Sequence, residues 1–228
     1  MLQYSHVCLI CWGLKFWRGG EILERLIDLS QMIVDDMPVY PGDSETNLIQ
    51  ISYLNIDKYN NHRLEISMHA GTHIDSPMHL TDSTEYISDS PLDSFIGNGC
   101  ILDVRDQPII SIRPEYDGLI IKNSIILLYT GQDKYYGQPQ YYSEHPVISM
   151  DFCELLLSKN IKMLGMDMPS PDQPPFHMHK LLLKAHIYLI ENLTNLDKLL
   201  GVKEFEVIAL PLKIKADSSM ARVVARII

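Results

Sequence analysis

The segment His69-Ala70-Gly71-Thr72-His73-Ile74-Asp75-Ser76-Pro77-Met78-His79 is the most informative stretch of this chain. Its three imidazoles and its carboxylate stand on odd-numbered positions, two or four residues apart. Alternate side chains of an extended backbone point to the same face, so these four side chains are expected to converge. The glycine and the proline between them disfavour a helix. The spacing therefore predicts a metal site on a strand that runs into a loop, with a hydrolase as the first hypothesis. The alternative is a set of ordinary polar side chains around a surface turn.

Length and composition indicate a globular protein with a core of its own. The 228 residues suit one large domain, and a hydrophobic content of 46% is ordinary for a soluble fold. A formal net charge of -10 argues against a nucleic-acid partner, because phosphate binding needs clustered lysine and arginine. We therefore expect no nucleic-acid or membrane partner.

The beginning of the chain is harder to interpret. Residues 7–17 are apolar and aromatic, but this run is shorter than the ~20 residues of a spanning helix. It also lacks the basic leader and cleavage site of a signal peptide. We expect residues 1–25 to form an extension of uncertain role, either an arm packed on a neighbouring subunit or a translated upstream region. Residues 26–228 are expected to form a single domain.

The four cysteines do not form a recognisable framework. Cys8 and Cys11 make a C-x-x-C pair, but no second pair at zinc-ribbon spacing follows it. Cys100 and Cys153 stand alone in apolar surroundings. Buried free thiols are the favoured interpretation, with a structural zinc at the first pair as the alternative. Free thiols suit a reducing cytoplasm, which is the expected location.

Strand-like segments dominate the rest of the sequence, and helices are few. Runs rich in Ile, Val, Leu and Tyr, bounded by turn residues, predict strands at 26–29, 48–56, 64–69, 100–104, 125–130, 161–166, 187–190, 206–210 and 222–228. Helical spacing predicts helices at 151–159, 176–184 and 195–200. Ser149 is the candidate N-cap of the first and Asn160 its stop, and the last is capped by Thr194 and closed by Gly201. The pattern is that of a mixed α/β domain with a central sheet.

A second group of metal-ligand side chains lies downstream. His177 and His179 start a predicted helix, and Glu191 ends an apolar strand. A carboxylate at such a place is costly unless it is paired or bound to a cation. The alternative is a strand end exposed to solvent.

Together these motifs resemble the cyclase family of metal-dependent hydrolases, which includes bacterial kynurenine formamidases and isatin hydrolases. The signature is His-x-Gly-Thr-His-x-Asp-x-Pro-x-His at 69–79. Residues 38–43 resemble the family's early substrate loop, 130–131 a recurring strand end, 165–172 a recurring turn, and 189–193 the late metal-binding strand. The resemblance implies a swivelling β/β/α domain with a central β-sheet and few helices, and a homo-oligomer (dimer or tetramer).

The same resemblance implies a role for each residue of the site. His69, His73 and Asp75 would hold one metal, and Asp75 would bridge to a second. The second would be held by His179, with Glu191 also ligating or bridging; His179 is preferred to His177 because it stands twelve residues before Glu191, as in the family. His79 would be the catalytic acid/base. Imidazoles and carboxylates without a thiolate suit Zn²⁺ or Mn²⁺, two per active site.

The chemistry that follows is hydrolysis of an amide C–N bond. A metal lowers the pKa of bound water to about 7, supplying hydroxide that would attack the carbonyl carbon while His79 transfers the proton. The leading substrate class is a small aromatic formamide; the alternatives are a cyclic imide, lactam or isatin-like ring, or a metal-stabilised binding protein without catalysis. Tyr40 is the expected substrate-binding residue, standing where kynurenine formamidases usually have tryptophan, and Gln132 stands where an aromatic residue is common.

Overall fold

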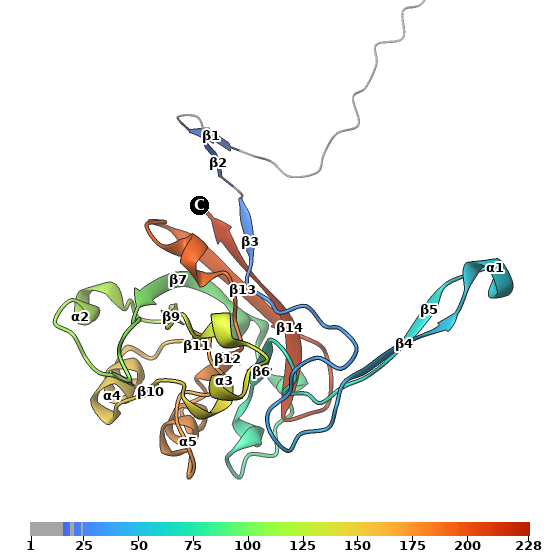
Figure 1. Ribbon diagram of the computed structural model, residues 1–228. Helices are drawn as coiled ribbons and strands as arrows, with labels where there is room; N and C mark the ends of the chain where they lie inside the picture. The colour runs from blue at the N-terminus through green and yellow to red at the C-terminus, as the bar shows by residue number, and fades with distance from the viewer. Residues whose placement is uncertain (1–15, 19–20, 24) are drawn as a thin grey trace, which may run out of the picture.

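Eight strands form the central sheet of the computed structural model, which describes residues 16–18, 21–23 and 25–228 (Figure 1). Their order is β13-β7-β9-β11-β12-β6-β14-β3, and β13 also pairs with β14, which gives the sheet a barrel-like form. The strands β7, β9, β11 and β12 are parallel neighbours, whereas β6 and β14 join antiparallel. This mixed α/β architecture confirms the predicted fold class. The bounds are β3 Leu26–Asp28, β6 His73–Asp75, β7 Ile96–Asp103, β9 Ile125–Tyr129, β11 Met163–Met166, β12 Tyr188–Glu191, β13 Phe205–Pro211 and β14 Ser218–Ile227.

The remaining elements are short. Two-stranded sheets pair β1 (Phe16–Arg18) with β2 (Glu21–Leu23), β4 (Asn47–Ser52) with β5 (Asn61–Glu65), and β8 (Ile109–Ile110) with β10 (Val147–Ile148). The described helices are α1 Leu54–Asp57, α2 Tyr116–Leu119, α3 Pro139–Ser143, α4 Met150–Lys159 and α5 His177–Lys184. Single 3-10 turns are η1 Pro77–His79, η2 Ile87–Asp89, η3 Leu92–Phe95, η4 Gln132–Tyr135 and η5 Leu196–Leu199.

The central strand β9 is covered on both faces, as its unbroken apolar sequence predicts. Ile126 and Leu128 pack in one core cluster with side chains of α4 and α5. Ile125 and Leu127 pack in a second cluster on the opposite face, with side chains of β13 and β14. Such two-sided burial is typical of parallel strands.

The helix signals in the sequence are confirmed at α4 and wrong near residue 195. The Ser149 hydroxyl accepts a hydrogen bond from the Phe152 amide, and Asn160 ends α4 in the left-handed conformation. In contrast, 195–200 contains only the 3-10 turn η5, and the residue at its N-terminal boundary is Asn195. Thr194 is therefore not the cap residue, and its hydroxyl donates a hydrogen bond to Asp133. A positive φ at Gly201 then ends this segment, as predicted.

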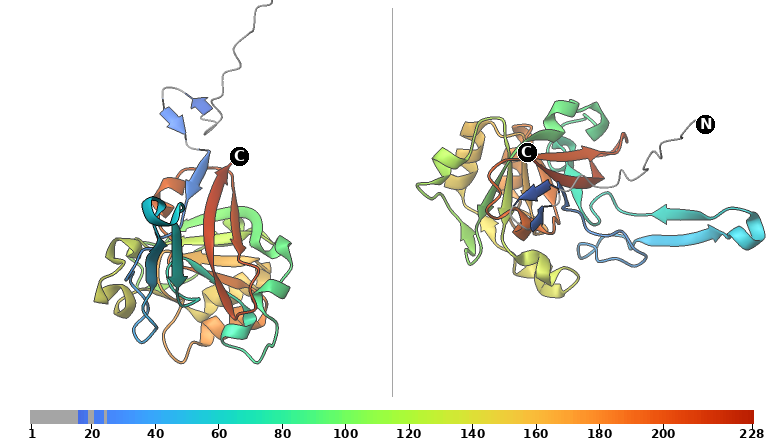
Figure 2. Two further views of the ribbon diagram at one scale, coloured as in Figure 1. Left: turned by 90° about the vertical axis from the view of Figure 1, so that its right-hand side faces the viewer. Right: turned by 90° about the horizontal axis from the view of Figure 1, so that it is seen from above.

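Two predicted strands end earlier than the sequence indicated. β4 stops at Ser52 and is followed by α1, and β5 stops at Glu65. Together β4, α1 and β5 form a hairpin (residues 47–65, called the arm below) that projects away from the body of the molecule (Figure 2). Apolar side chains of the arm are exposed, including Leu54 and Ile56 at 60% and 70%. The pattern of apolar residues could not reveal where these strands end. Apolar and polar residues alternate where one face of a strand is buried, and the arm has no such face.

The cysteines that the structure describes are free. Cys153 is buried and Cys100 is half-buried, and burial raises the pKa of both thiols to about 11, so they are poor nucleophiles. Cys8 and Cys11 lie outside the described residues. Within the described part of the chain, no helix has the length and apolar character needed to cross a membrane.

Candidate functional site

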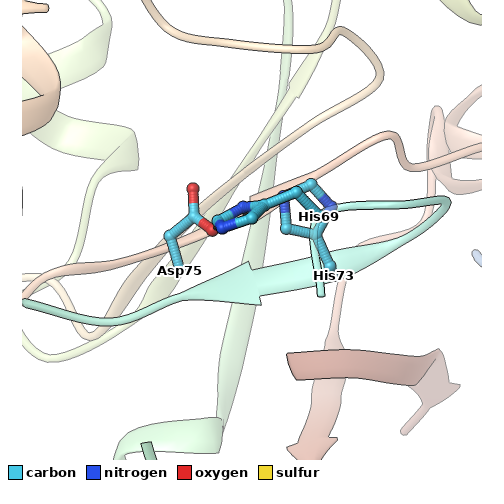
Figure 3. Close-up of side chains that lie close together, drawn as sticks. All are labelled: His69, His73 and Asp75. Atoms are coloured by element: carbon cyan, nitrogen blue, oxygen red, sulfur yellow. Dashed lines mark ion pairs between the residues drawn. The ribbon is translucent and has the colours of Figure 1, made fainter. Parts of the chain in front are cut away.

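The four side chains of the 69–79 segment do converge, but not on one continuous strand. Only the segment His73–Asp75 is a strand, β6. His69 lies in the turn before it, where Gly71 has a φ of +65°, and His79 ends η1. Figure 3 shows His69, His73 and Asp75 close together on and beside β6. The predicted convergence is therefore confirmed, and a strand does run into the turn that carries His79. The expected strand at His69 is wrong, because β5 stops at Glu65 and His69 lies in a turn.

Strand order brings the downstream carboxylate to the same place. β6 lies between β12 and β14, and Glu191 of β12 pairs directly with His73. His179 reaches the cluster from α5. Glu191 is 5% exposed, so the alternative of a solvated strand end is wrong.

Each of the two carboxylates faces imidazoles on both of its oxygens. Asp75 Oδ1 lies 3.0 Å from His69 Nδ1 and 3.4 Å from His73 Nε2, while Oδ2 lies 3.2 Å from His179 Nε2. Glu191 Oε2 lies 3.5 Å from His73 Nε2, and Oε1 lies 3.7 Å from His179 Nε2. The five side chains thus divide into two adjoining groups that share Asp75 and Glu191.

Burial and opposite charge set the protonation of the cluster. Burial lowers the pKa of His73 to about 4. Burial would also lower the pKa values of the other two imidazoles, but Asp75 and Asp217 raise that of His69 to about 11, and Asp172 and Asp75 raise that of His179 to about 10. Burial and the neighbouring Asp75 charge raise the pKa of Glu191 well above its usual range. The raised pKa values of His69 and His179 favour their protonated forms, whose positive charges balance that of Asp75.

The polar atoms left without hydrogen-bond partners fit a metal. His73 Nε2, Asp75 Oδ1 and Glu191 Oε1 are buried and make no hydrogen bond. Buried polar atoms are rarely left without partners in native proteins. Two ligands of one zinc ion at ~2.1 Å are roughly 3.0–3.4 Å apart, close to the distances above. The residues present therefore fit a divalent cation.

A cavity of about 210 Å³ opens onto this cluster. Its floor includes His69, His73, His79, His179 and Glu191. Its walls are mainly apolar and aromatic, with Pro38, Val39, Tyr40, Leu80, Tyr142 and Phe176. The predicted substrate loop thus lines the cavity, with the Tyr40 ring edge-on to Tyr142 at 5.7 Å between centroids. Gln132 is buried beside the backbone of Gln140, outside the cavity lining.

The structure adds two carboxylates that sequence reasoning missed. Asp172 approaches His179 Nδ1 at 3.5 Å and accepts a hydrogen bond from the Met178 amide. Asp217 lies 3.0 Å from His69 Nε2 and 3.2 Å from His79 Nδ1. Asp172 belongs to the recurring turn at 165–172, which was the available signal. Asp217 carries no spacing signal, because its partners His69 and His79 are more than 130 residues away in the sequence.

Among the residues that the structure describes, the histidines outside the predicted set lie apart from the cluster. His62, His177 and His186 are exposed, and the buried His145 contacts Gln173. The preference for His179 over His177 thus agrees with where the structure places the two rings.

Comparisons with known proteins agree with these features. Residues 27–173 match the family described as "Putative cyclase". A kynurenine formamidase of Salinibacter ruber is 31% identical over 208 residues, covering 88% of this chain and 97% of that protein. A kynurenine formamidase of Bacillus mycoides is 30% identical over 207 residues, covering 88% and 96%. Isatin hydrolase A from Labrenzia aggregata has a similar fold, with a TM-score of 0.77, 24% identity and coverage of 89% of this chain and 93% of that one.

Proposed function

The chain belongs to the cyclase family, and on this premise we propose that it is a metal-dependent hydrolase of amide C–N bonds. The observation that carries the proposal is a largely buried group of three imidazoles and two carboxylates, four of which line an aromatic cavity. Related formamidases cover 88% of the chain, which supports a small aromatic formamide as the substrate class.

The metal ligands in this proposal are His69, His73 and Asp75 for one ion, and Asp75, His179 and Glu191 for a second. When bound, Zn²⁺ or Mn²⁺ at this site supplies Lewis-acid chemistry, polarising a carbonyl and making water more acidic. Placing Asp75 and Glu191 between the two groups limits repulsion between two cations. Burial keeps His73 neutral, the form in which imidazole binds a metal.

His79 is the proton-transfer residue in this proposal. It lines the cavity, and one of its ring nitrogens lies within 4.8 Å of ligand atoms of Asp75 and His179. It takes a proton from the attacking water and returns it to the leaving nitrogen, releasing a carboxylate and an amine. Tyr40 and Tyr142 stack against or flank the aromatic part of the substrate.

The test is hydrolysis of N-formylkynurenine by chelator-stripped protein reloaded with Zn²⁺ or Mn²⁺. Turnover that depends on the metal, with kcat/KM at or above ~10⁴ M⁻¹s⁻¹, supports the formamidase assignment. Isatin is the second substrate, because ring opening of a cyclic amide needs the same attack on a carbonyl carbon. No metal-dependent turnover of either compound would contradict the proposal.

One variant separates an enzyme from a metal-stabilised binding protein. His79→Ala is expected to keep its bound metal and lose turnover by about 10²–10⁴-fold, the usual contribution of general acid–base catalysis. The control is Asp82→Asn, a change at an exposed position three residues away. A His79→Ala variant as active as the wild type would assign the proton transfer to another group.

A further inference from the structure

Asp217 connects a proposed metal ligand to the proposed proton-transfer residue. The same oxygen, Oδ2, lies 3.0 Å from His69 Nε2 and 3.2 Å from His79 Nδ1. The two imidazole rings are close neighbours, with 4.2 Å between centroids. An ionised carboxylate only accepts hydrogen bonds, so each ring donates an N–H to it.

The backbone holds Asp217 in this place from both sides. Its carbonyl oxygen accepts hydrogen bonds from the Ser76 amide at 3.1 Å and from the Ser76 hydroxyl at 2.7 Å. The next residue, Ser218, pairs with Asp75 across β14 and β6. The backbone of Asp217 is therefore held against Asp75 and Ser76, in the middle of the segment that carries the site.

The hydrogen bond from His79 Nδ1 decides which nitrogen is free. A neutral imidazole has one N–H and one lone pair. If Nδ1 donates to Asp217, the lone pair is on Nε2. Proton abstraction from water requires such a lone pair, held in a fixed direction.

We propose that Asp217 is a positioning residue that holds His79 as its Nδ1–H tautomer, leaving Nε2 to exchange protons with substrate. This inference rests on the proposed function in assigning His79 to proton transfer. Asp217 does not itself exchange the proton. The alternative is that Asp217 orients only His69, in which case its loss would weaken metal binding and leave His79 unaffected.

The first test reads the tautomer without any substrate. Long-range ¹H–¹⁵N NMR of the zinc-loaded protein, with the His79 signals identified by their loss in His79→Gln, is expected to show protonated Nδ1 in the wild type. In Asp217→Asn the amide group can donate to Nδ1, so the proton is expected on Nε2. Asp82→Asn is the matched control and should keep the wild-type tautomer. An Nε2–H tautomer in the wild type, or an unchanged tautomer in Asp217→Asn, would overturn the proposal.

The second test is a double-variant cycle on turnover. Asp217→Asn is expected to lower kcat by about 10²–10⁴-fold with an unchanged metal content, and to lower it no further in the His79→Ala background. An equal loss in both backgrounds, or loss of metal in Asp217→Asn, would place its action on His69 instead and overturn the proposal. A wild-type protein that hydrolyses neither substrate, yet shows the expected tautomers, would contradict the proposed function and leave the positioning of His79 intact.

Discussion

Asp75→Asn is the sharpest perturbation of the proposed metal centre. Asp75 is 1% exposed and faces the imidazoles of His69, His73 and His179 at 3.0–3.4 Å. The substitution keeps the size of the side chain and removes one of the two negative charges in the five proposed ligands. It also replaces one oxygen by an amide group that cannot ligate as an anion.

The magnitude follows from the lost charge. One pair of unit charges ~4 Å apart contributes about 4 kcal/mol at an effective dielectric constant of 20, and more for a divalent ion. Since 1.4 kcal/mol is a factor of ten, the metal affinity should fall by at least ~10³-fold. At a free metal concentration ~1,000-fold above the wild-type Kd, binding stabilises the wild type by about 4 kcal/mol but the variant by only about 0.4 kcal/mol.

Calorimetry of the apo and metal-loaded proteins measures this difference. A chain of this size gains about 2–4 °C in Tm for each kcal/mol, so zinc should raise the wild-type Tm by about 8–16 °C and that of Asp75→Asn by about 1–2 °C. Asp82→Asn should behave as the wild type. An Asp75→Asn protein that binds as much zinc and gains the same Tm would refute the proposed ligand set.

Three further predictions concern the surroundings of the site. Burial raises the pKa of Asp167 to about 6, so the folded state binds more protons than the unfolded state between about pH 4 and 6. The free energy of unfolding should therefore fall by about 3 kcal/mol as pH rises through this window and stay level above it. Urea unfolding measures this pH dependence, which Asp167→Asn should lack. Tyr40→Ala should raise KM about 5–10-fold with a smaller change in kcat, because an aromatic contact is worth about 1 kcal/mol, and Tyr40→Phe should restore KM. The expected homo-oligomer stays a prediction, and the exposed arm is the expected contact because a two-stranded hairpin is marginally stable in isolation. The double variant Leu54→Glu, Ile56→Glu should reduce the mass measured by light scattering toward the 26.1 kDa of one chain. An unchanged mass would exclude the arm as the contact between subunits.

The convergence of His69, His73, Asp75 and His79 was predictable because these residues lie close together in sequence. The alternation in 69–79 marked the four side chains correctly, although the backbone reaches the same arrangement through a turn at Gly71 and a 3-10 turn at Pro77. Runs of apolar residues likewise predicted the central strands, because strands with both faces buried need apolar side chains at successive positions. The bounds of the two strands of the arm escaped prediction for the opposite reason, since exposed residues have no core that requires a regular apolar pattern.

The position of the carboxylate Asp217 depends on the order of strands in the sheet and not on local sequence spacing. Asp217 reaches His79 across 138 residues only because β14 lies beside β6 and pairs Ser218 with Asp75. A shift of that pairing by one residue would turn the side chain to the other face of the sheet. Local spacing contains no information on such a register. The proposed metal ligands could therefore be inferred from a motif, whereas Asp217, the proposed positioning residue, could be found only once the neighbouring strand and its register were known.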